Sequence, residues 1–386
     1  MGSHFLDSQE DLLLLIPGPT PVPGRVLRAG SRPMMNHRCP AFHELLTSIT
    51  ADLRGCFGTA GNPLTLTASG TGGLEAAVVN TLSPGDAVLA VVTGAFGVRF
   101  AEIAAAYGAN VTRLDFEWGQ AADPAAVAEA LAAGDYKAVL LTLNETSTGV
   151  VNPVQQLAAL AREAGALVLV DAISGLLATP CETDGWDLDV VVAGSQKAFM
   201  IPPGLTFVTM SERAWTASKS ATMPRFYFDL AAAAKTLEKG ENPWTPAVSL
   251  LYGLRESLDM IVEEGLNNVQ RRHERLRDGV RAGAAELGFT PLAEAAVASP
   301  AVTSFLPPGG FEGDALRKIL RNKYGLELAG GQGPLKGKIV RFGHLGYVHD
   351  ADVLKGLSLL GAALDELGHD VDAGRALAAA REAMGR

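Results

Sequence analysis

Short apolar runs alternate with alanine-rich stretches over the first two thirds of the chain. The stretches Pro124–Ala133 and Pro153–Ala164 have the composition of helices. Uninterrupted apolar strands that alternate with helices are typical of a mostly parallel sheet covered on both faces. We therefore predict an α/β fold in which ligands bind at the carboxyl ends of the strands. The expected strands are Leu64–Thr67, Ala87–Val92, Val139–Thr142, Leu167–Val170, Val190–Val192 and Thr206–Val208.

The pattern changes after Pro246 to an amphipathic helix, which resumes after Gly265. Later strands are expected near Ala301–Phe305 and Lys338–Phe342, and helices near residues 313–323 and 350–367. These elements predict a smaller C-terminal α/β domain. We assign residues 1–20 to an N-terminal segment, 21–260 to a large domain and 261–386 to the small domain. Met1 to His4 are interpreted as the remnant of a tag.

Composition narrows the class of protein. The 386 residues are 48% hydrophobic, enough for one large core and a second smaller one. No run approaches the ~18 apolar residues of a membrane span, and no signal peptide is recognised. Three cysteines without CxxC spacing argue against a disulfide framework or a metal site, so we expect a cytoplasmic protein. A net charge of -10 argues against a nucleic-acid partner.

Two expected strands lead to residues that could take part in catalysis. Asp171 ends the run that begins at Ala166, and Lys197 follows the run Val190–Val192. A buried carboxylate followed by a lysine is what the cofactor pyridoxal 5'-phosphate requires. The lysine forms a Schiff base with its aldehyde, and the carboxylate keeps its pyridine nitrogen protonated. We predict that Lys197 and Asp171 are the catalytic residues, with Lys197 also acting as the acid-base group.

A glycine-containing turn, Ser69-Gly70-Thr71-Gly72-Gly73, follows one expected strand and precedes a helical segment. Backbone N–H groups at such a helix start can bind a phosphate. The dinucleotide pattern GxGxxG fails because Glu75 takes the place of the third glycine, and no P-loop lysine follows. A tight turn without a ligand remains an alternative for this segment.

Six segments in order resemble class V aminotransferases, in the alanine/serine–glyoxylate branch. They are Pro17–Thr20, Ser69–Glu75, Asn144–Gly149, Ala193–Gly204, Thr245–Leu250 and Arg341–Gly346. The resemblance implies a fold-type I enzyme that is a homodimer and uses pyridoxal 5'-phosphate. The expected reaction transfers an amino group from a small amino acid, alanine or serine, to a small 2-oxo acid, glyoxylate or pyruvate.

The resemblance also implies residue roles. Ser69, Gly70 and Thr71 would contact the cofactor phosphate, and Phe96 would stack on its ring. Thr146 and Gln196 match positions that bind ring substituents or phosphate, although turn and strand-end roles explain them equally well.

Two further positions concern the substrate and the dimer. Arg341, in an otherwise apolar strand, would grip the substrate carboxylate, with a structural salt bridge as the alternative. Thr245 would reach the phosphate of the partner subunit's cofactor.

Two other functions stay open. A class V lyase of the cysteine desulfurase type needs a mobile catalytic cysteine and usually a histidine beside the lysine, where this chain has Gln196. A catalytically idle binding protein of the same fold is the second alternative. Retention of Asp171, Lys197 and Arg341 together argues against an idle protein. The residues do not identify the amino donor.

Overall fold

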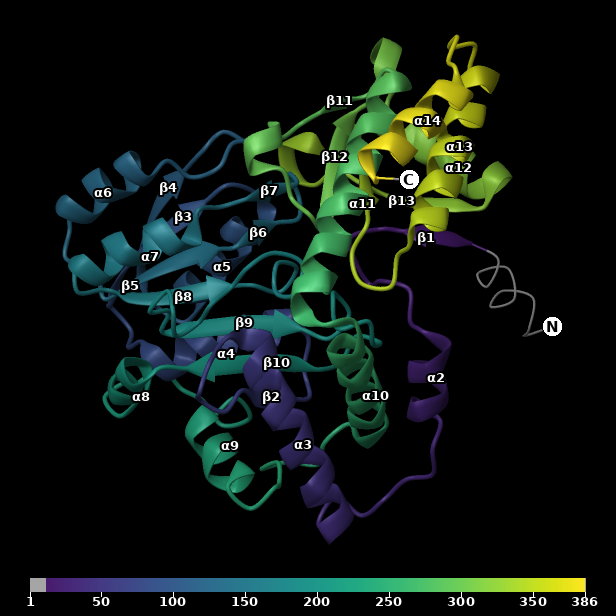
Figure 1. Ribbon diagram of the computed structural model, residues 1–386. Coiled ribbons are helices and arrows are strands. Elements are labelled where there is room, and N and C mark those ends of the chain that lie inside the picture. Colours follow the sequence, from purple (N-terminus) through teal and green to yellow (C-terminus); the bar gives the residue numbers. More distant parts are fainter. Residues whose placement is uncertain (1–11, 386) are drawn as a thin grey trace.

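The computed structural model describes residues 12–385, so the interpreted tag remnant Met1 to His4 lies outside the described residues. The chain forms a seven-stranded and a five-stranded sheet, which we call the large and the small sheet. Figure 1 shows the large sheet on the left and the small sheet at the upper right. Helices α10 (Val248–Glu264) and α11 (Leu266–Glu286) lead from one sheet to the other, and they meet at Gly265 with a positive φ of 85°.

The large sheet has the order β2-β10-β9-β8-β5-β3-β4. Strands β3, β4, β5, β8 and β9 pair in parallel, whereas β10 is antiparallel to both of its neighbours. The predicted mostly parallel sheet is therefore confirmed. Its strands are β2 (Leu64–Leu66), β3 (Ala87–Val92), β4 (Asn110–Asp115), β5 (Ala138–Thr142), β8 (Leu167–Asp171), β9 (Val190–Gly194) and β10 (Thr206–Met210).

Alternate residues of each strand point to opposite faces of the large sheet, and helices cover both. In β8, Val168 and Val170 pack in the core with α3 (Pro40–Phe57), α6 (Pro124–Ala132) and α7 (Val154–Glu163). Leu167 and Leu169 face the other core. That core contains α4 (Gly70–Thr81), α5 (Ala95–Ala106), α8 (Glu212–Ser218) and α9 (Leu230–Leu237). Each such fully buried side chain contributes roughly 1.5–3 kcal/mol.

The small sheet has the order β1-β13-β14-β12-β11. Its first strand comes from the start of the chain and pairs in parallel with β13. Helices α11, α13 (Asp350–Glu366) and α14 (Ala373–Ala383) contribute to its core, and α12 (Gly313–Tyr324) packs on β13. The strands are β1 (Leu13–Leu15), β11 (Thr290–Pro291), β12 (Val302–Leu306), β13 (Leu326–Gly330) and β14 (Val340–Gly343).

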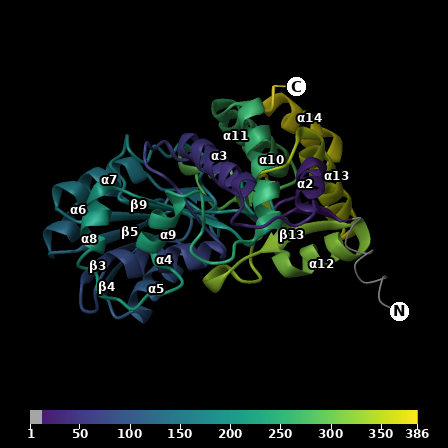
Figure 2. The same cartoon turned by 90° about the horizontal axis from the view of Figure 1, so that it is seen from below.

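Helix α10 links these layers to the N-terminal part of the chain. Both α2 (Gly24–Gly30) and α3 pack against it, as Figure 2 shows from below.

A short hairpin of β6 (Asn144–Glu145) and β7 (Val150–Val151) follows β5. Among residues 12–385, no helix combines the length and apolar character that crossing a membrane requires.

Candidate active site

Lys197 lies in the turn that follows β9, and its side chain is buried. Its Nζ donates a hydrogen bond to the carbonyl oxygen of Pro17 (2.7 Å). A Cβ on Gly18 would come within 2.8 Å of the lysine Cε, so only glycine lets the chain pass this closely. Thr20 donates from its backbone to the Gln196 carbonyl (3.1 Å) and from Oγ1 to the Lys197 carbonyl (3.1 Å). The segment after β1 therefore packs directly on the lysine.

Asp171 is the last residue of β8, and β8 is the parallel neighbour of β9. Carboxyl ends of neighbouring parallel strands meet at one edge of the sheet, which brings Asp171 close to Lys197. The backbone N–H of Ile173 donates to its carboxylate (2.9 Å). Burial raises the pKa of the Asp171 carboxyl to about 7, although the positive charge of Lys197 favours its ionised form.

Burial has the opposite effect on the amine. The pKa of Lys197 is lowered to about 8. Removal of the ammonium from water is the largest cause and the positive charge of Arg341 adds to it, whereas Asp171 opposes the shift. A substantial fraction of Lys197 is therefore neutral slightly above neutral pH. A neutral amine is the form that attacks a carbonyl group.

Arg341 reaches this site from the small sheet. Its side chain is buried, and Nε donates to the Gly330 carbonyl (2.7 Å) while Nη1 donates to the Thr146 carbonyl (3.1 Å). In the described part of the chain, its hydrogen-bond partners are carbonyl oxygens rather than a carboxylate. Within residues 12–385, Arg341 therefore does not form the structural salt bridge that was the alternative to substrate binding. The remaining N–H groups of the guanidinium can donate hydrogen bonds to an anion.

The segment after β14 also returns to the lysine. A Cβ on Gly346, which has a φ of +72°, would lie 2.9 Å from the Lys197 carbonyl oxygen. The backbone N–H of Gly346 donates to Nε2 of His273 in α11 (2.9 Å). Burial lowers the pKa of His273 to about 3, so its ring is neutral and can accept this bond. Helix α11 thereby fixes the chain beside the lysine.

The expected phosphate turn leads into α4. Ser69 is the N-cap residue, and Gly70 and Thr71 form the first turn. The hydroxyl of Ser69 makes no capping bond, and its side chain is exposed. A Cβ on Gly70 would come within 2.6 Å of Ile173 Cδ1, so the helix start lies next to the strand end that carries Asp171. The predicted turn-to-helix geometry is confirmed, and it aims the positive end of the helix dipole at this site.

Phe96 lies in the first turn of α5 and is half-buried. The guanidinium carbon of Arg99 lies 4.9 Å from the centroid of its ring. Arg99 is also close enough to lower the pKa values of Asp171 and Lys197. We did not predict Arg99, because a single arginine on a helix carries no distinctive signal in the sequence.

The hairpin after β5 contributes Asn144, Glu145 and Thr146. The Thr146 hydroxyl is 2.6 Å from the Ser174 hydroxyl, which also accepts a bond from Asn144 Nδ2 (2.9 Å). Glu145 is fully buried, and its carboxylate accepts bonds from the backbone N–H of Phe96 (3.1 Å). We predicted a role for Thr146 but not for Glu145. An acid just after a buried apolar run, the signal that identified Asp171, was present for Glu145 too.

Thr245 lies apart from the lysine, in the exposed segment before α10. It lines a small cavity of about 20 Å³ with Asn242 and Tyr227. Trp244 stacks on Phe226, with ring centroids 4.7 Å apart. The structure therefore gathers Asp171, Lys197, Arg341 and their neighbours within one chain and leaves Thr245 at the surface.

Two buried polar atoms near the lysine have no hydrogen-bond partner among the described residues: Asn144 Oδ1 and Gln196 Oε1. Buried polar atoms normally find a partner, so this pair indicates that a polar group belongs beside them. A pyridine ring with a hydroxyl substituent, an aldehyde and a phosphate fits the set of groups at the site: an amine, a carboxylate and a helix N-terminus. The residues present are thus compatible with pyridoxal 5'-phosphate.

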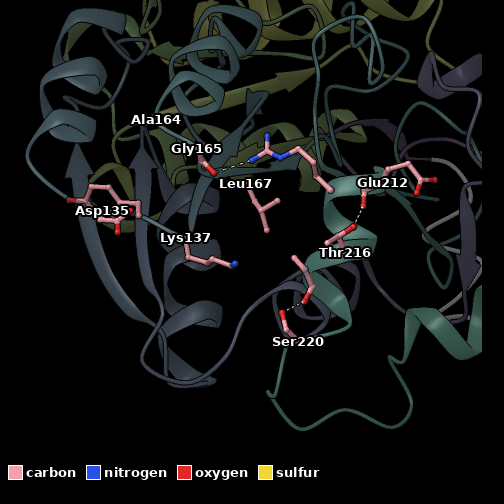
Figure 3. A pocket seen from close by; sticks show the side chains of 11 residues that line it. Asp135, Lys137, Ala164, Gly165, Leu167, Glu212, Thr216 and Ser220 are labelled. Atoms are coloured by element: carbon pink, nitrogen blue, oxygen red, sulfur yellow. Dashed lines mark hydrogen bonds between the residues drawn. The ribbon is translucent and has the colours of Figure 1, made fainter.

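Figure 3 shows a separate cavity of about 580 Å³, lined by Lys137, Leu167 and Ser220 among others. It lies where β5 and β8 begin, at the edge of the sheet opposite Asp171. Arg213 beside it donates to the Gly165 and Ala166 carbonyls (3.0 Å each), which holds a turn in place. Ligands of parallel sheets bind at the carboxyl ends of strands, so we place the active site at the other edge.

Comparison with known proteins finds relatives over almost the whole chain. The family profile described as Aminotransferase class-V matches residues 18–348. The soluble hydrogenase 42 kDa subunit of Anabaena cylindrica is 42% identical, over 96% of this chain and 98% of its own. Serine–glyoxylate aminotransferase of Methylorubrum extorquens is 36% identical, over 95% and 94%. The crystal structure of ureidoglycine–glyoxylate aminotransferase from Bacillus subtilis superposes with a TM-score of 0.92 at 31% identity, covering 97% of this chain and 98% of that one.

The raised pKa of Asp171 predicts a pH-dependent stability of the cofactor-free protein. The folded protein holds this proton up to about pH 7, whereas an unfolded Asp, with its ordinary pKa of 3.8, loses it at about pH 4. The ionised carboxyl therefore destabilises the fold increasingly as pH rises from about 4 to 7. Asp171→Asn removes this effect, and we expect its gain in unfolding free energy over wild type to be larger at pH 7.5 than at pH 5, by on the order of 1–3 kcal/mol.

Urea denaturation at the two pH values measures this difference. Asp189→Asn is the control, because the fully buried Asp189 carboxylate accepts a bond from Val168 N (2.9 Å) and lies near Arg213 (3.5 Å). That variant should lose stability at both pH values. An Asp171→Asn difference that does not change with pH would contradict the assignment of a buried, titrating carboxyl.

Proposed function

Because the chain belongs to the class V aminotransferase family, which uses pyridoxal 5'-phosphate, we propose that it transfers an amino group between a small amino acid and a small 2-oxo acid. Alanine or serine is the proposed donor, and glyoxylate or pyruvate the proposed acceptor. The observation that carries the proposal is that Lys197 lies within electrostatic reach of both Asp171, at the end of a large-sheet strand, and Arg341, from the small sheet. Chemistry on an amino acid needs these three groups together.

Lys197 and Asp171 have complementary roles in the proposal. When bound, the cofactor supplies a ring that withdraws electrons from the substrate's α-carbon. Lys197, whose lowered pKa favours the neutral amine, would hold the cofactor through its aldehyde. With substrate bound, the same amine would be placed to move a proton at the substrate's α-carbon. Asp171 would hold the proton on the pyridine nitrogen through a charge-assisted hydrogen bond.

The remaining residues hold the cofactor in place. We assign Ser69, Gly70 and Thr71 to the phosphate, because the start of α4 offers backbone N–H groups and a positive dipole end. Phe96 is assigned to stacking on the ring. A ring substituent or the phosphate is the proposed partner of Thr146 and Gln196. Only a donor such as a ring hydroxyl could satisfy Gln196 Oε1, which accepts hydrogen bonds and has no partner among the described residues.

Glyoxylate as acceptor is supported by two relatives. The Methylorubrum enzyme and the Bacillus structure both carry glyoxylate in their names, whereas their donors differ, serine in one and ureidoglycine in the other. A shared acceptor with variable donors fits a site in which one feature, the carboxylate grip of Arg341, is common to all substrates. The donor side chain is then selected by other parts of the pocket.

The cysteine desulfurase alternative is less well supported. Burial raises the pKa values of Cys56 and Cys181 to about 12, so neither is a ready thiolate. Cys39 is half-buried and is the N-cap residue of α3, an ordered helix end rather than a mobile loop. A lyase of that type needs a reactive, mobile cysteine.

Lys197→Ala should abolish the covalent link to the cofactor. After borohydride treatment of the holoenzyme, mass spectrometry should find the reduced adduct on Lys197 in wild type and nowhere in the variant. Transamination should fall on the order of 10²–10⁴-fold, the usual contribution of a general acid-base group. Lys137→Ala, at the opposite edge of the sheet, is the control and should keep the adduct and the activity. An adduct on another lysine would refute the assignment.

Arg341→Ala should keep the absorbance of bound cofactor but lose the grip on the substrate. Loss of hydrogen bonds to a charged group should lower kcat/KM for every α-amino acid by about 10- to 100-fold, mainly through KM. Amines without a carboxylate should change much less. Arg213→Ala is a matched control, since Arg213 also donates to backbone carbonyls, those of Gly165 and Ala166 (3.0 Å each), at the opposite edge of the sheet. Loss of the cofactor or of the fold in Arg341→Ala would place the residue in the scaffold instead.

We further propose that the enzyme is a homodimer in which Thr245 contacts the phosphate of the partner's cofactor. Thr245 is exposed within one chain, as an interface residue would be. Large apolar side chains nearby in the fold are also exposed, with Phe226 at 75% and Leu27 at 56%. Leu27 and Leu250 line an apolar groove of about 290 Å³ between α2 and α10. A second copy would cover these surfaces.

Subunit mixing tests the shared site. Thr245→Glu should inactivate the homodimer, because a carboxylate would repel the phosphate. Lys197→Ala should be inactive for its own reason. Refolding the two variants together should restore activity, since one site of the mixed dimer combines an intact Lys197 with an intact Thr245. Light scattering should give a dimer mass for each variant. A fully active monomer, or no recovery in verified mixed dimers, would contradict the shared site.

A further inference from the structure

Glu145 lies between the groups assigned to the cofactor ring and to the substrate carboxylate. Its side chain is fully buried. The carboxylate accepts bonds from the backbone N–H groups of Phe96 (3.1 Å) and Gly97 (3.1 Å) in the first turn of α5. It also accepts from the backbone N–H (3.0 Å) and the hydroxyl (2.6 Å) of Ser147 in its own turn. One side chain thus joins two segments that are separated by about 50 residues of sequence.

We propose that Glu145 is a positioning residue that sets the orientation of the Phe96 ring and of Arg341 toward cofactor and substrate. This proposal rests on the proposed function. The link to Phe96 is the pair of bonds to the first turn of α5. The link to Arg341 runs through the next residue in the chain, because the Thr146 carbonyl accepts the Arg341 Nη1 bond (3.1 Å).

The surroundings of Glu145 are built for a carboxylate. Every partner named above is a donor, and a carboxylate accepts without donating. Gly94 provides the space, because a Cβ there would come within 2.5 Å of Glu145 Cγ and 2.6 Å of Cδ. The Ser147 hydroxyl that donates to Glu145 also accepts from Ala95 N (2.9 Å). Burial raises the pKa of the Glu145 carboxyl, whereas the bonds from Ser147, Gly97 and Phe96 and the dipole of α5 favour its ionised form.

The same charge acts on the catalytic groups. Burial lowers the pKa of Arg341 to about 10, and Glu145 opposes this shift, which helps to keep the guanidinium charged. Glu145 also adds to the burial that raises the pKa of Asp171. The position of Glu145 therefore links the fold of the helix start to the chemistry of the site.

Glu145→Gln is the decisive variant, because the amide keeps the size but places an NH₂ group against N–H donors. The holoenzyme should retain borohydride-reducible cofactor. Its visible circular dichroism band, which reports how the bound cofactor is oriented, should weaken or change sign. kcat/KM for the amino donor should fall by about 10-fold or more, with a higher KM because Arg341 is displaced. The dichroism is recorded without amino acid, so it stays informative even if the proposed donors are wrong.

Glu75→Gln is the matched control. Glu75 accepts a bond from the Tyr107 hydroxyl (3.0 Å) at the far end of α5, so its loss also loosens this helix but away from the site. The control should keep the dichroism band and the KM of wild type. If Glu145→Gln keeps both as well, or lowers only the melting temperature, as Glu75→Gln would, then Glu145 is merely a helix cap and the proposal is wrong.

Ser147→Ala covers the case in which Glu145→Gln does not fold. It removes the hydroxyl bonds to Glu145 and Ala95 but leaves the carboxylate and its backbone donors. We expect a smaller change of the dichroism band and of KM in the same direction. Wild-type values for both in Ser147→Ala, with Glu145→Gln unfolded, would count against the proposal.

Discussion

A buried amine and a buried carboxylate at the ends of two neighbouring parallel strands set the conditions for the rest of the structure. Desolvation pushes their pKa values toward each other, to about 8 for Lys197 and about 7 for Asp171. A buried charge without a partner is unfavourable, so the surrounding chain must supply hydrogen bonds in place of those that water would make. The Pro17 carbonyl and the Ile173 N–H supply two of these bonds. A bound cofactor would give both charges a further polar partner and so offset part of the cost of removing them from water.

Segments distant in sequence converge to meet that demand. The chain before Thr20 leaves the small sheet and packs on Lys197, and the chain after β14 returns to the same place at Gly346. The neutral ring of His273 fixes that return. Both sheets therefore depend on the geometry around one lysine. A displaced lysine turn would disturb the packing of the segment after β1 and, through Gly346, the contact with α11.

Local patterns predicted the large sheet well, because its strands are continuous apolar runs that only burial on both faces explains. They missed β4, an edge strand with exposed polar residues, and they also missed α14. At the site, Lys197, Asp171 and Arg341 were recognisable as polar residues in apolar surroundings. Arg99 was not, because its importance arises from a neighbour in space. The assigned roles, the domain boundaries and the contribution of Thr245 stay predictions, the last because it depends on a second chain.

Arg341 stands on the small sheet, whereas Lys197 and Asp171 stand on the large one. A substrate held by its carboxylate at one sheet and by its amine at the other would span the gap between two separately built layers. The width of that gap then determines how many carbon atoms can separate the amine from the carboxylate of a substrate. Discrimination between α- and β-amino acids would therefore reside in the spacing of the two sheets, and a change far from any substrate contact could alter it.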